Sequence, residues 1–89
     1  MAEDNVIFVG AKPTMNYVLA VVTQFHNNVD NVVIKARGRA ISKAVDVVEI
    51  VKNKFMNDLK DSNIEVGTEE LQNEKGKLNV STISITLQK

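Results

Sequence analysis

Apolar residues along this chain of 89 residues form short continuous runs and helical stripes. Val6 to Val9 is a continuous apolar run that ends at Gly10, which predicts a short strand buried on both faces. Apolar side chains then recur at helical spacing from about Pro13 to His26, which predicts the first helix. The first third of the chain therefore predicts a strand, a turn and a helix.

The middle of the chain predicts a second strand followed by a second helix. The segment from Val32 to Arg37 alternates with a period of two, so Val32, Ile34 and Ala36 share one face and the other face ends in cations. The second helix runs from about Arg39 to Phe55, and its apolar residues cover nearly half of the helical wheel. One sheet normally covers a smaller part of a helix surface, so we infer that the helix packs on its own sheet and on a second subunit. Deep burial within one subunit is the alternative.

The last third of the chain predicts a β-hairpin. Asn57 to Asn63 is polar and predicts a loop, after which a third strand begins at Ile64. Hydroxyl and apolar residues alternate over Thr82 to Leu87, which predicts a fourth strand with one buried and one solvated face. Between these strands, Gln72 to Lys77 predicts the hairpin tip, with Gly76 in the turn. The predicted order of elements is βαβαββ.

Four cations gather where the second strand becomes the second helix, at a join marked by Gly38. They are Lys35, Arg37, Arg39 and Lys43. A helix N-terminus carries partial positive charge, so cations there are unfavourable unless an external anion such as phosphate completes the site. A solvated basic turn explains the local charge equally well.

The predicted topology brings a fifth cation to this site. The first two strands are joined through a helix and should therefore be parallel, with a right-handed crossover. Their C-terminal ends then lie at one edge of the sheet, which places Lys12 near Arg37, Arg39 and Lys43 and favours the phosphate interpretation. At the hairpin tip, Lys75 and Lys77 suit an arm that reaches into a groove, although an ordinary charged hairpin fits them equally well.

Composition restricts the class of protein. The length and the 44% hydrophobic content suit one globular domain over residues 1–89, and the absence of cysteine excludes disulfides and thiolate–metal sites. The acidic stretch Met1–Asn5 is not followed by the apolar region of a signal peptide, and no apolar run is long enough to span a membrane. We therefore expect a cytoplasmic protein with no membrane partner.

Charge is balanced overall but unevenly distributed. The formal net charge is zero, which argues against an indiscriminate binder of polyanions. Residues 35–43 carry four cations and no acid, whereas residues 58–74 carry six acids and one lysine. The chain is therefore strongly dipolar in sequence.

The sequence contains no recognisable catalytic motif. It has no Walker-type or G-x-G-x-x-G loop, the single His26 has no evident partner, and Ser42, Ser81 and Ser84 lack an identifiable base. We therefore expect a non-enzymatic protein without a cofactor. A small phosphoryl-ligand enzyme or sensor is the alternative from another class, and an assembly role centred on the second helix is a third.

Three segments resemble the Alba family of archaeal chromatin proteins. They are Gly10-x-Lys12-Pro13-x-Met15-Asn16-Tyr17-Val18-Leu19-Ala20, Val33 to Val51 and Val80 to Ile83. The resemblance implies an α+β two-layer sandwich in the wider α/β class, with a four-stranded mixed sheet packed on two helices. This fold is like the C-terminal domain of translation initiation factor 3, and the resemblance also implies a homodimer built through the second helix and the neighbouring sheet.

The resemblance also implies a function in chromatin organisation or regulation at the chromosome. In the family, the dimer lays its basic body on duplex DNA or RNA and its hairpins reach into the minor grooves. Lys12, Arg37 and Arg39 match the phosphate-contacting body, Lys35 and Lys43 are their neighbours, Lys75 and Lys77 fall in the hairpin, and Phe55 matches an aromatic residue of dimer–dimer contacts.

Three departures from the family pattern predict a weaker or more selective binder than a bulk coating protein. Ala11 stands where family members often have a second lysine, the hairpin strands carry Glu69, Glu70 and Glu74, and the chain is neutral. Double-stranded DNA is the expected partner. RNA is the alternative, because the sequence reveals no aromatic stacking platform that would decide between the two.

Overall fold

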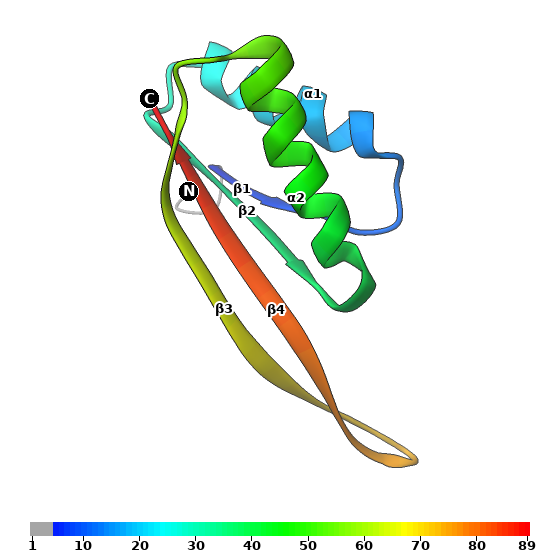
Figure 1. Cartoon of the computed structure of the whole chain (residues 1–89). Coiled ribbons are helices and arrows are strands. Elements are labelled where there is room, and N and C mark those ends of the chain that lie inside the picture. Colours follow the sequence, from blue (N-terminus) through cyan, green and yellow to red (C-terminus); the bar gives the residue numbers. More distant parts are fainter. Residues whose placement is uncertain (1–4) are drawn as a thin grey trace.

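A four-stranded mixed sheet and two helices form two layers (Figure 1). The fold is known from a computed structural model that describes residues 5–89. Most of the acidic N-terminal stretch used to predict the absence of a signal peptide lies outside the described residues. The elements are β1 (Val6–Phe8), α1 (Thr14–His26), β2 (Asn31–Arg37), α2 (Ile41–Ile50), β3 (Lys60–Asn73) and β4 (Gly76–Gln88).

The sheet has the strand order β1-β2-β4-β3. β1 is parallel to β2, with Val6 opposite Val33, whereas β4 runs antiparallel to both β2 and β3. The predicted order βαβαββ, the parallel crossover between the first two strands and the mixed α+β fold are therefore confirmed. Among the described residues, no helix is both long and apolar enough to cross a membrane.

The hydrophobic core lies between the two helices and the inner face of the sheet. The period-two pattern of β2 directs Val32, Ile34 and Ala36 into this core, as predicted. The inner face also carries Ile85 and Leu87 of β4. The helices contribute the buried residues Val18, Val21, Val22 and Phe25 of α1 and Ala44, Val47 and Val48 of α2.

The outer face of the sheet has no helix over it, and this corrects one prediction. β1 is an edge strand, and the helices cover only the other side of the sheet (Figure 1). Successive side chains of a strand point to opposite faces, so Ile7 packs against the core while Phe8 points outward and is 69% exposed. The prediction that Val6–Val9 is buried on both faces is therefore wrong.

The second helix extends to Phe55, as predicted. A single 3₁₀ turn, Gly38–Ala40, precedes α2, and a π-helical segment, Val51–Phe55, continues it. The single chain buries Ala44, Val47, Val48 and Val51, so burial within the chain accounts for the middle of the wide apolar stripe. Val45 and Phe55 remain 41% and 46% exposed. Packing of their side of the helix on a second subunit stays a prediction.

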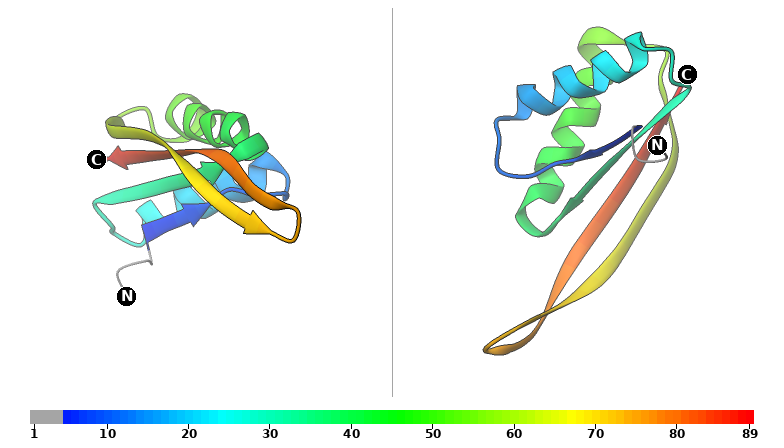
Figure 2. Two further views of the ribbon diagram at one scale, coloured as in Figure 1. Left: turned by 90° about the horizontal axis from the view of Figure 1, so that it is seen from below. Right: turned by 180° about the vertical axis from the view of Figure 1, so that it is seen from behind.

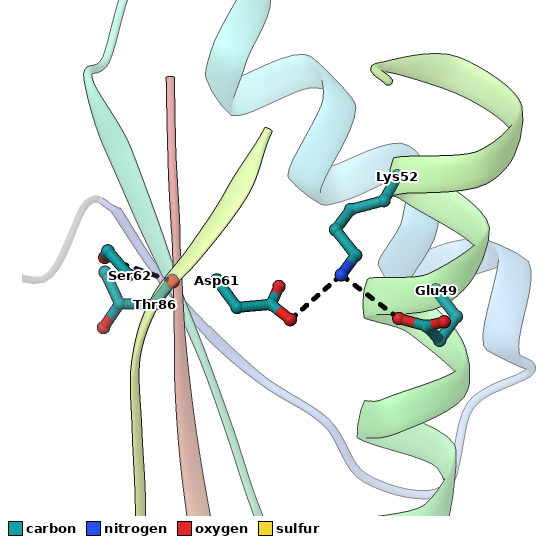
Figure 3. A network of polar contacts seen from close by, with 5 residues as sticks. All are labelled: Glu49, Lys52, Asp61, Ser62 and Thr86. Atoms are coloured by element: carbon teal, nitrogen blue, oxygen red, sulfur yellow. Dashed lines mark hydrogen bonds and ion pairs between the residues drawn. The ribbon is translucent and has the colours of Figure 1, made fainter. Parts of the chain in front are cut away.

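The third strand begins earlier than predicted. β3 starts at Lys60, so the prediction of a loop over Asn57–Asn63 is wrong for its second half. These polar residues form a strand because β4 satisfies their backbone groups, and a bulge between Asp61 and Asn63 absorbs one extra residue. At this bulge the Ser62 hydroxyl donates to the Thr86 carbonyl at 3.4 Å (Figure 3).

An ion pair between Lys52 of the second helix and Asp61 joins the helix to the start of β3. The Lys52 ammonium lies 2.9 Å from Asp61 and 3.3 Å from Glu49 (Figure 3). The hydrogen bond to Asp61 raises the pKa of Lys52 above its usual value against the opposing effect of burial, and Glu49 adds to the increase. The contact therefore joins the C-terminal part of the second helix to the start of β3.

β3 and β4 continue past both helices as a two-stranded arm (Figures 1 and 2). The molecule measures 44 × 25 × 20 Å because of this arm. Its turn is formed by residues 74 and 75, and Gly76 follows with a φ of 124°, which confirms the predicted tip. Leu71 lies opposite Leu78 near the end of the arm.

Candidate functional site

The loop between β1 and α1 is held by two side chains that contact the same two residues. The Lys43 ammonium donates to the carbonyl oxygens of Gly10 and Lys12, at 2.9 and 2.8 Å. The Tyr17 hydroxyl oxygen accepts the N–H groups of the same residues, at 2.9 Å from Gly10 and 3.1 Å from Lys12. Lys43 and Tyr17 together fix the backbone on either side of Ala11.

A glycine shapes the join between β2 and α2. Gly38 has a φ of 59°, in the left-handed region that favours glycine, and a Cβ atom there would lie 3.4 Å from Val80 Cγ1. The 3₁₀ turn that follows carries Arg39. Neither this turn nor α1 or α2 has a side-chain cap or an acidic residue in its first turn. Both helices therefore begin near this edge without an acidic side chain to offset the partial positive charge of the helix N-terminus.

These elements gather four cations that we call the basic edge: Lys12, Arg37, Arg39 and Lys43. Arg37, Arg39 and Lys43 line a shallow hollow of about 340 Å³ together with Gly10, Ala11 and Ala40. The contact between Lys43 and the Lys12 carbonyl confirms that the crossover brings the two loops together. Positive side chains beside helix N-termini form a surface suited to phosphate oxygens.

An acid from the hairpin already contacts the basic edge. Glu69 of β3 forms an ion pair with Arg37, and both side chains are about half exposed. This pair is not predicted from the sequence, although the opposite charges of residues 35–43 and 58–74 are a signal for it. Within residues 5–89, no ion pair involves Lys12 or Arg39. The cations of the basic edge therefore differ in their availability to an external anion.

The other predicted site residues lie in three separate places. Lys35 is on the outer face of the sheet, opposite Phe8 in register and two residues from Arg37. Lys75 and Lys77 are at the tip of the arm, where Lys77 lies 3.8 Å from Glu70. Phe55 ends the second helix. The structure thus gathers four of the seven predicted cations and leaves three apart.

Tyr17 is the single tyrosine of the chain, so its ionisation reports on the contacts of this loop. Burial alone would raise the pKa of Tyr17, but the N–H donors of Lys12 and Gly10 and the positive charges of Lys43 and Lys12 lower it below its usual value. Stability should therefore rise as the pH increases through the lowered pKa, because the fold favours the phenolate.

We expect a tyrosine absorbance titration to give a midpoint below that of free tyrosine, and Lys43→Met to raise that midpoint. Lys54→Met removes an exposed lysine near the other end of the second helix and is the matched control, with an unchanged midpoint. An equal midpoint in the Lys43→Met variant and the original protein would contradict the proposed contact between Lys43 and the loop.

Residues 5–67 match the family model described as Alba. The chain is 64% identical over 87 residues to "DNA/RNA-binding protein Alba" of Thermoplasma acidophilum, and the match covers 98% of each chain. It is 65% identical over 88 residues to the protein of the same name from Picrophilus torridus, again with 98% of each chain covered.

Two solved structures have the same fold. The structure of Alba from Thermoplasma volcanium is 62% identical and superposes with a TM-score of 0.92, covering 96% of this chain and 100% of that chain. The crystal structure of ALBA1 from Trypanosoma brucei is 26% identical with a TM-score of 0.79, covering 97% of this chain and 69% of that chain.

Proposed function

The chain belongs to the Alba family, and on this premise we propose that it is a non-enzymatic homodimer that binds nucleic acid. Its main contacts are with the phosphates of duplex DNA, and residues 1–89 act as one binding domain. The observation that carries the proposal is the basic edge, where Lys43 and Tyr17 hold the backbone of Lys12 next to a hollow that Arg37 and Arg39 line. Relatives named DNA/RNA-binding proteins support the same conclusion.

Lys43 has a positioning role in this proposal. Its ammonium is already bonded to two carbonyl oxygens, so it shapes the loop and adds to the local potential more than it bonds a phosphate directly. Lys12, Arg37 and Arg39 are the residues that contact phosphate. Lys35 is a neighbouring cation on the outer face of the sheet.

The homodimer forms through the second helix and the adjoining edge of the sheet. Val45 of the helix and Ile64 and Val66 of β3 are apolar side chains that are 41%, 54% and 78% exposed. The register places Ile64 opposite the core residue Ile85 and Val66 opposite Ile83, which packs against the core, so both lie on the helix side of the sheet. A second copy that covers this strip removes it from water.

The arm extends the contact beyond the body of the dimer. Its length and its exposed Lys75 and Lys77 suit insertion into a minor groove, where cations read groove width more than base identity. Phe55, half exposed at the end of the second helix, suits contacts between neighbouring dimers on the duplex. Such binding would organise or regulate the chromosome with little base specificity.

The acidic hairpin makes this binding selective rather than indiscriminate. Glu69 competes with phosphate for Arg37, and the chain has no net charge to draw it to every polyanion. We therefore propose a weaker or more selective binder than a bulk coating protein.

A salt titration tests the proposed mechanism. If each subunit contributes Lys12, Arg37 and Arg39, a dimer neutralises about six phosphates, and the slope of log K against log salt is roughly −5, at about −0.9 per phosphate. Binding of duplex DNA is followed by fluorescence anisotropy at several salt concentrations, and subunit mass is measured by light scattering. A flat salt response would contradict the proposal, and saturable binding of inorganic phosphate without duplex binding would favour the phosphoryl-ligand alternative.

RNA is the second candidate partner, and one feature of the fold favours it. The outer face of the sheet is open and carries the exposed ring of Phe8, so the chain does have an aromatic group positioned for stacking. Competition between matched DNA and RNA duplexes at one salt concentration separates the two partners.

A further inference from the structure

The outer face of the sheet carries a row of four chemically different side chains. Phe8 of β1, Lys35 of β2, Ser84 of β4 and Glu65 of β3 are successive partners in the strand register. They therefore lie side by side across all four strands, on the face that the helices leave open (Figure 1). The row offers an aromatic ring, a cation, a hydroxyl group and a carboxylate to one ligand.

Two shallow hollows flank Phe8 and Lys35 on this face. One, of about 440 Å³, is also lined by Glu65, Gly67 and Ser84. The other, of about 500 Å³, is also lined by Tyr17, Arg37 and Glu69. Because Arg37 lines this second hollow and the hollow of the basic edge, the open face is continuous with the proposed phosphate site.

We propose that this face binds an unpaired segment of single-stranded RNA, with one base stacked on the ring of Phe8. The proposal rests on the proposed nucleic-acid binding and adds a second mode to it. Lys35 and Arg37, on the same face, are the cations for the phosphates on either side of the stacked base. The carboxylates of Glu65 and Glu69 repel phosphate, so they admit the edge of a base in preference to the backbone.

The central strand supplies the groups that favour RNA over DNA. Thr82, Ser84 and Thr86 of β4 alternate onto the outer face, where each is only partly exposed. Their hydroxyl groups both donate and accept hydrogen bonds, as the ribose 2′-hydroxyl does. The apolar strip proposed for the dimer, Val45, Ile64 and Val66, is on the helix side of the sheet and leaves this face open.

Single-residue variants measured against two probes test the proposal. The probes are fluorescently labelled single-stranded oligocytidylate RNA, whose amino groups match the carboxylates of the site, and duplex DNA at the same salt concentration. Phe8→Ala should weaken RNA binding about tenfold to a hundredfold, since stacking of one base contributes about 1–3 kcal/mol. Duplex affinity should stay within about twofold, and Phe8→Tyr should retain RNA binding because it keeps the ring. Leu19→Ala removes a comparably exposed apolar side chain from α1 and should leave RNA affinity unchanged.

Three outcomes would overturn the proposal: equal RNA affinity in the Phe8→Ala and Leu19→Ala variants, an equal loss for both probes, or equal affinity of the original protein for oligodeoxycytidylate and RNA. Photocrosslinking of the original protein to RNA that contains 5-iodocytidine gives a readout independent of folding in the variants. Crosslinks should map to the peptide that contains Phe8, and crosslinks confined to the arm would contradict the assignment. If the original protein bound the RNA probe but not duplex DNA, the proposed duplex binding would be refuted and the RNA site would still stand.

Discussion

Replacing Arg37 and Arg39 together with alanine is expected to lower the affinity for duplex DNA roughly a thousandfold at physiological salt. A dimer would lose four of about six phosphate contacts, and each charge-assisted contact contributes about 1 kcal/mol or more. Only Lys12 of each subunit would remain, so the slope of log K against log salt should become shallower, from roughly −5 to roughly −2. Both arginines lie on exposed backbone turns or strand ends, so the fold should persist.

The measurement is the anisotropy titration with circular dichroism as the check on folding. Glu69→Gln is the control with the opposite expected effect. It removes the carboxylate that pairs with Arg37 and removes no cation, so affinity for duplex DNA should rise. Exposed ion pairs contribute about 0.2–1 kcal/mol each, and the proposed dimer has two of them, so this variant should bind duplex DNA about twofold to thirtyfold more tightly. Equal affinity in the original protein and the double alanine variant would mean that phosphate binds elsewhere.

Replacing Val66 with aspartate is expected to convert the proposed dimer to a monomer. Val66 is 78% exposed in one subunit, so the folded subunit should tolerate the carboxylate. In the dimer the same carboxylate would be buried without a partner, which costs several kcal/mol. A monomer presents three phosphate contacts, so the salt slope should fall to roughly −3.

Sedimentation velocity measures the subunit mass directly. Leu19→Asp introduces the same charge at an exposed apolar position of α1 and should leave the dimer intact. A Val66→Asp protein that keeps the dimer mass would place the interface elsewhere, and a monomeric original protein would remove the dimer from the proposal.

Local patterns in the sequence predicted the elements that pack against the core. Two patterns indicate directly which side chains are buried. They are the period-two alternation of Val32–Arg37 and the spacing of apolar residues in both helices. The crossover rule then brought the Lys12 loop to Lys43, because chain connectivity restricts how two parallel strands can be joined.

Features that depend on tertiary neighbours were not visible in the sequence. The exposure of Phe8 follows from the strand order, which places β1 at an edge, and the strand at Lys60–Asn63 follows from pairing with β4 rather than from apolar pattern. The ion pair of Arg37 with Glu69 joins residues that are 32 positions apart. The sequence also could not show that the Lys43 ammonium bonds two carbonyl oxygens, because the same lysine could equally contact a phosphate.

The ion pair between Arg37 and Glu69 gives the protein a counterion of its own. A free arginine on a protein surface attracts anions from solution, and these return to solution when phosphate replaces them. Here the displaced anion is Glu69, which remains attached to the chain after Arg37 turns to the duplex. No anion from solution is therefore released at Arg37, and the salt slope of roughly −5 reflects only the cations that leave the DNA.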